Sequence, residues 1–323
     1  MFTKTIKRYL LCSTFLLILI YGCGSQRSTS GKSPDRSERK MLLRDEGLSQ
    51  LSYVDLANPN KNWYVPVPAG RDLQLVGSGR VLIGTATGYE ERNIKTGAKL
   101  NEVNAFAGTI GVRRLRNGNT LLTGLNWLGN RGIVLLEIDR NGATNRVINY
   151  PTFNYVRLVR ETVAGTFLVT ADDVVFEGKA DGTIIWQAKV LAKVKPHAWQ
   201  ALRLANGQTV VSTGYGANFQ VFGVDGKLVD SITGPANVNP SFYAGFQILD
   251  NGNMLVSNWQ GHGPKFGASG TQILEHTPAG ALAWNWKQDP AKFSSIQGVI
   301  VLDGLDLNKL HVEDGSGKLV PVK

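Results

Sequence analysis

The sequence contains almost no cysteine. Among 323 residues only Cys12 and Cys23 occur, and both lie within the first 23 positions. The rest of the chain therefore forms no internal disulfide and no cysteine-based zinc site. Such a domain must be held together by its hydrophobic core, and about 270 residues are enough to bury a large one.

Other common chemical machinery is also missing. The chain has only four histidines, without the spacing of a zinc site. It has neither the glycine-rich loop that binds phosphates nor the Gly-x-Ser-x-Gly turn that carries a nucleophilic serine. These absences argue against nucleotide chemistry and serine-based acyl transfer, and we expect no cofactor and no bound metal.

The only long apolar run, residues 10–20, follows Lys4, Lys7 and Arg8 and is too short for a comfortable membrane span. We interpret residues 1–22 as a signal peptide. The segment ending at Cys23 resembles the lipobox of bacterial lipoproteins, which implies a lipid-anchored protein of the bacterial cell envelope. The alternative is ordinary signal-peptidase cleavage near this cysteine. Residues 23–49 are polar and serine-rich, and we expect them to form a flexible tether.

The net charge of +10 falls to +7 once the three basic residues of the leader are removed. The remaining Lys and Arg residues are scattered and form no basic run. We therefore expect no nucleic-acid partner. The membrane, through Cys23, is the expected partner, and we expect the protein to be a monomer.

A strand–turn–strand motif returns about every 45 residues. The best copies contain Asn117-Gly118, Asn206-Gly207 and Asn251-Gly252, and in each an apolar strand precedes and follows the turn. Asn-Gly favours a two-residue hairpin turn. Weaker copies lie at 76–82 and 163–168, and a degenerate sixth lies at 301–310. A repeat of this length built from short strands predicts a β-propeller with four-stranded blades.

The outermost strand of three repeats carries a tryptophan, namely Trp63, Trp186 or Trp284. Residues 51–67 form the outer half of a repeat, and residues 296–312 form the inner half of another. We predict that these halves pair, two strands from each end, and close the ring without an exposed sheet edge. The prediction is an all-β, six-bladed propeller over residues 50–323.

In a propeller, the loops between the second and third strands and the loops between blades emerge on one face around the channel. We expect a funnel there that takes up a small-molecule, glycan or protein ligand. The candidate ligand-binding residues are Asn126, Trp127, Trp199, Tyr215, Gln247, Asn258, Trp259 and Gln297.

The sequence Asn-Trp-x-Gly occurs twice on this face, at Asn126-Trp127 and at Asn258-Trp259. Two exposed indole rings would stack on sugar or aromatic rings, and the amides would orient polar groups. Equally, the tryptophans would pack beneath loops and the asparagines would form local turns.

His197 is the best candidate for chemistry because a histidine can act as acid, base or nucleophile. Arg157 and His262 would support it if the protein is an enzyme. Each histidine also has a structural interpretation, His197 as a bonded residue at a blade junction and His262 in a surface loop. Asp172 and Asp173 form the only acidic cluster on this face, and a Ca²⁺ site needs more oxygen ligands than these two supply.

The repeats, with Asn-Gly-Asn before an apolar strand and Asp-x-x-Gly before the outer one, resemble exported bacterial propellers of the quinoprotein-like (PQQ-like repeat) superfamily and, more loosely, arylsulfotransferases. Quinone-dependent members of that superfamily usually have eight blades and a pair of adjacent cysteines, which this chain lacks. Two functions follow as hypotheses. One is a membrane-anchored propeller that binds a ring-containing ligand such as a glycan. The alternative is an enzyme of arylsulfotransferase, hydrolase or lyase type that uses His197.

Overall fold

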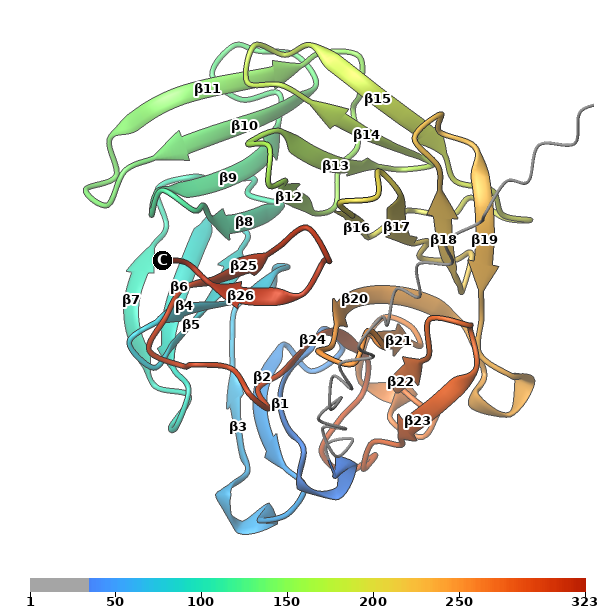
Figure 1. The fold of residues 1–323 in the computed structure, drawn as a ribbon. Helices are drawn as coiled ribbons and strands as arrows, with labels where there is room; N and C mark the ends of the chain where they lie inside the picture. The colour runs from blue at the N-terminus through green and yellow to red at the C-terminus, as the bar shows by residue number, and fades with distance from the viewer. Residues whose placement is uncertain (1–34) are drawn as a thin grey trace, which may run out of the picture. The chain divides into compact units, whose positions relative to one another are not determined.

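The computed structural model describes residues 35–323, so the predicted signal peptide and Cys23 lie outside the described residues. Six four-stranded antiparallel sheets form the blades of a ring around a central channel (Figure 1). This arrangement confirms the predicted six-bladed β-propeller. No helix within residues 35–323 is long and apolar enough to cross a membrane.

The strands of each blade run from the channel outward in chain order. Blade one has β4 (Leu73–Gly77), β5 (Arg80–Thr85), β6 (Gly88–Asn93) and β7 (Lys99–Val103). Blade two has β8 (Gly111–Arg114), β9 (Thr120–Leu125), β10 (Ile133–Ile138) and β11 (Thr144–Tyr150). Blade three has β12 (Val159–Glu161), β13 (Phe167–Ala171), β14 (Val174–Gly178) and β15 (Ile184–Lys189).

The later blades follow the same order, except that the sixth takes strands from both ends of the chain. Blade four has β16 (Gln200–Arg203), β17 (Thr209–Ser212), β18 (Phe219–Phe222) and β19 (Leu228–Ile232). Blade five has β20 (Phe242–Ile248), β21 (Met254–Trp259), β22 (Ile273–His276) and β23 (Leu282–Trp286). Blade six has β24 (Ile296–Val301), β1 (Lys40–Asp45), β2 (Gln50–Asp55) and β3 (Trp63–Pro66). Single 3-10 turns are η1 (Arg36–Glu38), η2 (Pro59–Lys61), η3 (Ala236–Val238) and η4 (Pro264–Phe266).

The repeated Asn-Gly motif does connect the two inner strands of a blade, but the loop is one residue longer than predicted. Leu115 N–H bonds to the carbonyl of Asn119, and Gly118 N–H bonds to the carbonyl of Leu115. Only the glycine has positive φ, at 85°. This is the three-residue hairpin loop that ends in a left-handed glycine, and the copies at Gly207 and Gly252 repeat the same bonds. Asn117 instead caps the loop, because its side chain accepts a bond from Asn119 N–H.

The ring closes with three strands from the N-terminal end and one from the C-terminal end, so the predicted two-plus-two closure is wrong. β1 lies between β24 and β2, and it pairs Leu42 with Ile300 and with Tyr53. Residues 35–49, predicted to belong to the tether, are thus part of the blade. The sequence signal for this strand is weak because the strand ends in two charged residues, Arg44 and Asp45. Both are nevertheless buried in the structure. Asp45 accepts bonds from the backbone N–H groups of Ser294 and Ser295.

The last residues of the chain form a separate hairpin, not the degenerate repeat predicted at 301–310. Strands β25 (His311–Glu313) and β26 (Leu319–Pro321) pair only with each other and lie in the middle of the ring (Figure 1). Isolated bridges join the adjoining residues Leu310 to Val76 in blade one and Lys318 to Ile248 in blade five. The hairpin therefore closes the channel at the end where the inner-strand turns lie, which we call the closed end.

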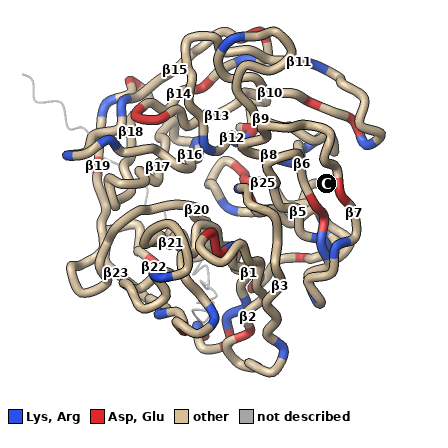
Figure 2. Tube along the Cα trace, turned by 180° about the vertical axis from the view of Figure 1, so that it is seen from behind, with Lys and Arg blue, Asp and Glu red and all other residues tan. Residues whose placement is uncertain are grey.

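Each of the six interfaces between neighbouring blades has its own apolar cluster. The tryptophans of the outer strands extend these contacts between blades. Trp63 donates to the carbonyl of Ile94 in the next blade at 3.1 Å. The guanidinium of Arg203 lies 4.1 Å from the Trp186 ring centre, and that of Arg39 lies 4.4 Å from the Trp284 ring centre. Lys and Arg are interspersed with Asp and Glu around the ring (Figure 2).

Candidate functional site

The opposite end of the channel, which we call the open end, contains a cavity of about 260 Å³. We call it the upper cavity. Its lining includes Glu46, Arg71, Arg157, Trp199, Tyr215, Phe242, Trp259 and His262. Arg71, Arg157 and Trp199 precede inner strands, whereas Glu46, Tyr215 and Trp259 lie at or after the ends of second strands. Loops from distant parts of the sequence thus meet at one end, as the topology predicted.

Four aromatic rings form a continuous edge-to-face group in this cavity. The ring centre of Phe242 lies 5.5 Å from that of Trp199, 4.7 Å from that of Tyr215 and 5.2 Å from that of Trp259. Edge-to-face packing fixes ring orientation. Trp199 and Trp259 are each only 7% exposed, whereas Tyr215 is 42% exposed. The cavity therefore has a rigid aromatic wall with one accessible ring.

Two guanidinium groups lie against the same indole. Arg71 and Arg157 both lie 5.6 Å from the ring centre of Trp199. Burial, together with the charge of Arg157, lowers the pKa of Arg71 to about 10, and burial also lowers the pKa of Arg157. Both groups are still protonated at neutral pH. Their attraction to the indole face is a cation–π contact.

The acidic member of the cavity is Glu46. It accepts a hydrogen bond from Trp259 Nε1 at 3.2 Å and lies 2.9 Å from His262 Nδ1. The ring of His262 is edge-on to Trp259 at 4.6 Å, and its side chain is 77% exposed. His262 therefore lies at the rim, held by a carboxylate that belongs to the segment predicted to be tether.

His197 lies behind the cavity wall, not in the lining. Its Nδ1 is 2.7 Å from the hydroxyl of Tyr155 and 3.1 Å from Asp172 Oδ1. Burial lowers its pKa, and the charge of Asp172 opposes the shift. Tyr215 contacts His197 edge-on and separates it from the cavity. The prediction that His197 faces the cavity is therefore wrong, and within residues 35–323 no hydrogen bond joins His197, Arg157 and His262.

Asp172 and Asp173 each form an ion pair with a lysine side chain of the same protein. Lys195 lies 2.5 Å from Asp172, and Lys189 lies 3.6 Å from Asp173. Among the described residues no group of three or more His, Cys, Asp or Glu side chains could hold a metal ion.

The two Asn-Trp motifs differ in backbone conformation, which separates their roles. Asn126 has φ of 55° and its side chain accepts a bond from Gly132 N–H, so the chain turns and the Trp127 ring lies on Gly124. Trp127 Nε1 donates to the carbonyl of Ala107. Neither residue lines the cavity, and the prediction that Trp127 faces it is wrong.

Asn258 is buried in β21 and its amide donates to the carbonyls of Asn239 and Thr271. It keeps the strand extended up to Trp259, which does line the cavity. The prediction that Asn258 faces the cavity is therefore wrong. Its four bonding partners, all backbone groups, leave it no role beyond the fold.

Two glutamines predicted to bind ligand instead join neighbouring blades. Gln247 accepts from Val301 N–H at 2.8 Å, and Gln297 donates to the carbonyl of Gly70 at 2.8 Å. Gln200 bonds to Phe246 in the same manner. A buried amide satisfied in this way holds two blades in register. Only Gln297 also borders the upper cavity.

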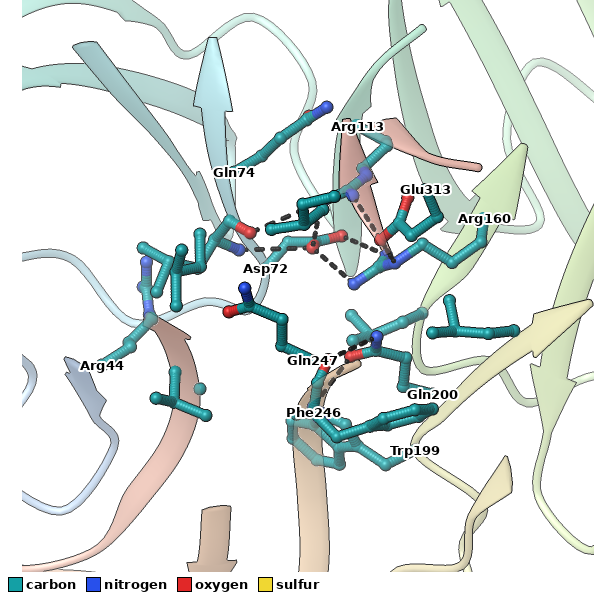
Figure 3. Close-up of a pocket in the computed structure, with 18 of the residues that line it drawn as sticks. Arg44, Asp72, Gln74, Arg113, Arg160, Trp199, Gln200, Phe246, Gln247 and Glu313 are labelled. Atoms are coloured by element: carbon teal, nitrogen blue, oxygen red, sulfur yellow. Dashed lines mark hydrogen bonds and ion pairs between the residues drawn. The ribbon is translucent and has the colours of Figure 1, made fainter. Parts of the chain in front are cut away.

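A smaller cavity of about 40 Å³, which we call the inner cavity, lies deeper in the channel (Figure 3). At its closed end Arg160 donates to both oxygens of Asp72, at 3.0 and 3.2 Å. Arg113 donates to Glu313 of β25 at 2.6 Å, and Arg160 lies 3.4 Å from the same carboxylate. Figure 3 shows these four side chains meeting one another.

The sequence did not point to Glu46 or Phe242, and it placed Arg71 on this face without assigning it a role. Glu46 was not considered because it lies in the segment predicted to be a tether. Phe242 begins an apolar strand, and an apolar residue there indicates burial but no binding role. Arg71 precedes an inner strand, as Arg157 does, and that shared position was the available signal.

No protein-family model and no curated protein matches the chain. Solved structures do match in fold. A protein of unknown function from Bacteroides caccae has a TM-score of 0.64 and 20% identity, and the match covers 82% of this chain and 99% of that one. A streptogramin B lyase has a TM-score of 0.54 and 13% identity, over 87% of this chain and 91% of the other. Regucalcin from Agrobacterium tumefaciens has a TM-score of 0.52 and 14% identity, over 81% and 94%. At these identities the matches show a common β-propeller fold.

Proposed function

We propose that this chain is an exported, membrane-anchored β-propeller of the quinoprotein-like superfamily that binds a ring-containing ligand in the upper cavity. The observation that carries the proposal is the aromatic wall of Trp199, Tyr215, Phe242 and Trp259 at the channel mouth. Rings held edge-on to one another present fixed faces and edges on which a flat ligand stacks. A cavity of about 260 Å³ lies slightly below the usual range for ligand sites, which begins at about 300 Å³. It therefore suits a ligand of one or two rings.

Tyr215 is the sharpest test of ligand binding, because it is the most exposed of the four rings. Replacing Trp259, by contrast, would also disturb the apolar group it shares with Phe242. Isothermal titration with glycosides and phenols should find a ligand, and Tyr215→Ala should weaken its binding by about 1 kcal/mol. Tyr64→Ala on the outer strand β3 is the matched control. Equal affinity in Tyr215→Ala and wild type would contradict the proposal.

Membrane anchoring rests on Cys23 and is tested separately. Growth with an alkyne-labelled fatty acid should label the wild-type protein, and Cys23→Ala should be unlabelled and released from the membrane fraction. If Cys23→Ala remains equally membrane-bound, the lipoprotein interpretation is wrong.

The group of Tyr155, His197 and Asp172 favours one alternative, an enzyme of the arylsulfotransferase, hydrolase or lyase type, because His197 bonds to the Tyr155 hydroxyl and lies 3.1 Å from Asp172 Oδ1. A carboxylate that fixes a histidine ring is a common arrangement for a general base. A structurally similar lyase from Staphylococcus aureus, with a TM-score of 0.50 and 13% identity, is inactive when one of its histidines is replaced by alanine. Arg157, which lies 4.5 Å from the Tyr155 ring centre, would connect this group to the cavity.

An assay of catalytic turnover distinguishes the proposed binding protein from the alternative enzyme. The alternative predicts that the wild-type protein releases 4-nitrophenol from 4-nitrophenyl sulfate or acetate. It further predicts that His197→Gln abolishes this activity without loss of ligand binding. A wild-type protein that binds ligand and turns over neither compound would contradict the arylsulfotransferase and hydrolase forms of the alternative.

A further inference from the structure

Arg71 and Arg157 have no hydrogen-bond acceptor for their side chains among residues 35–323. Each guanidinium carries five N–H groups in a fixed fork. The Trp199 face attracts their charge, but it does not accept these N–H groups as an oxygen would. The Nε atom of Arg157 is buried and without a partner. Donors of this kind are costly unless an acceptor reaches them.

The charge balance of the upper cavity is positive. Its lining contains Arg71 and Arg157 and one carboxylate, Glu46. That carboxylate already bonds to Trp259 and His262, and it forms no ion pair with either arginine. One additional negative charge would neutralise the two guanidinium groups together with Glu46. A doubly charged anion would leave an excess negative charge beside Glu46.

Both arginines line the upper cavity, and the charge of Arg157 acts on Arg71. Both lie against Trp199, at equal distances from its ring centre. The burial that lowers the pKa of each arginine reflects their partial removal from water. In such surroundings a charge-assisted hydrogen bond is stronger than in bulk solvent.

We propose that the upper cavity recognises a singly charged carboxylate attached to a ring, with the carboxylate held by Arg71 and Arg157 and the ring against Tyr215 and Trp259. This inference rests on the proposed function and names its ligand class. A planar carboxylate matches the planar fork of a guanidinium, which a neutral amide or hydroxyl does not.

Matched ligand pairs test the inference on the unaltered protein. Isothermal titration would compare 4-methylbenzoate with 4-methylbenzamide, and methyl β-glucuronide with methyl β-glucoside. In at least one pair the acid should bind about tenfold more tightly than its neutral partner, because it gains charge-assisted bonds. The pair that binds shows whether the ring is aromatic or a sugar. If acid and neutral partner bind equally, the charge inference is overturned while ligand binding stands. If no compound of either pair binds, the carboxylate inference fails.

Ligand binding itself has an independent readout, because the wider panel of neutral glycosides and phenols used with Tyr215→Ala contains no carboxylate. A neutral ligand found there, with no binding of the acids, would leave the proposed function standing alone. Binding by neither set would overturn both.

Substitutions of Arg71 and Arg157 test whether these two residues bind the carboxylate of the ligand. Arg71→Gln and Arg157→Gln should each reduce the affinity for the acid about tenfold and leave that for the neutral partner unchanged. Arg71→Lys should keep part of the affinity, since it retains charge but loses the fork. Arg140→Gln, an exposed arginine elsewhere on the ring, is the control. Acid binding that is unchanged in both glutamine variants would overturn the assignment of the carboxylate to these two arginines.

Discussion

At the closed end of the channel Arg113 and Arg160 lie among the carboxylates of Asp72 and Glu313, whereas at the open end Arg71 and Arg157 lie against an indole ring. The residue type and the position near the channel axis are the same at both ends. The two pairs of arginines differ in what their guanidinium groups contact, which is carboxylates at the closed end and an indole ring at the open end. A buried ion pair that loses one member leaves an uncompensated charge, so the closed-end arginines are committed to the fold. The side chains of the open-end arginines have no hydrogen-bond acceptor among residues 35–323, and the proposed carboxylate would supply one.

The largest expected effect comes from removing the C-terminal hairpin. A chain that ends at Leu310 lacks Glu313 and the apolar cover that Val312 and Leu319 supply. We expect its free energy of unfolding to fall by more than about 5 kcal/mol, because lost ion pairs add to lost burial. Urea unfolding followed by circular dichroism measures this loss. A truncated chain with the wild-type unfolding midpoint would show that the hairpin contributes nothing to the stability of the fold.

Glu313→Gln isolates the ionic part of that effect. Arg113 and Arg160 would lose one of their two carboxylates, and we expect a loss of about 3–5 kcal/mol. Glu102→Gln, which breaks the exposed pair with Lys99, is the matched control and should unfold like the wild type. If both variants lose equally little stability, the closed-end network does not hold the fold.

Acid should weaken the closed end in a defined range. Burial tends to raise the pKa of Glu313, but Arg113 and Arg160 outweigh it and hold the pKa below its usual 4.5. A carboxyl whose pKa is lower in the folded state stabilises the fold above the unfolded pKa, and that stabilisation is lost as pH falls through the folded value. The wild type should therefore lose more stability than Glu313→Gln between pH 5 and pH 3. Parallel losses in the two proteins would contradict this assignment.

The smallest effect on stability is expected at the open end. Arg71→Gln and Arg157→Gln break no ion pair with residues 35–323, and each should lower the free energy of unfolding by only about 0.5–1 kcal/mol, the size of the lost cation–π contact with Trp199. Arg160→Gln, at the closed end, should cost several times more because it leaves Asp72 and Glu313 with Arg113 as their only cation in this group. Similar losses at the two ends would remove the contrast between structural and ligand-directed arginines.

The sequence predicted the fold well because its signals are local. Strand alternation, Asn-Gly turns and outer tryptophans each depend on a few consecutive residues, and together they gave six blades. The same local signals predicted less about the candidate site than about the fold. Asn126-Trp127 and Asn258-Trp259 have the same letters, yet one asparagine has positive φ and the other lies in a strand. That difference comes from Asn258's bonds to Asn239 and Thr271, which no short pattern encodes.

The sequence by itself determined the number of blades, the order of strands within the first five and the end of the channel where loops gather, because these follow from repeat length and chain direction. The tertiary structure alone decided how the ring closes, what fills the channel and which arginines keep a carboxylate. Arg113 and Glu313 are 200 residues apart, and Glu46 and Trp259 are 213 apart. Contacts over such separations depend on the closed ring, which brings the two ends of the chain together.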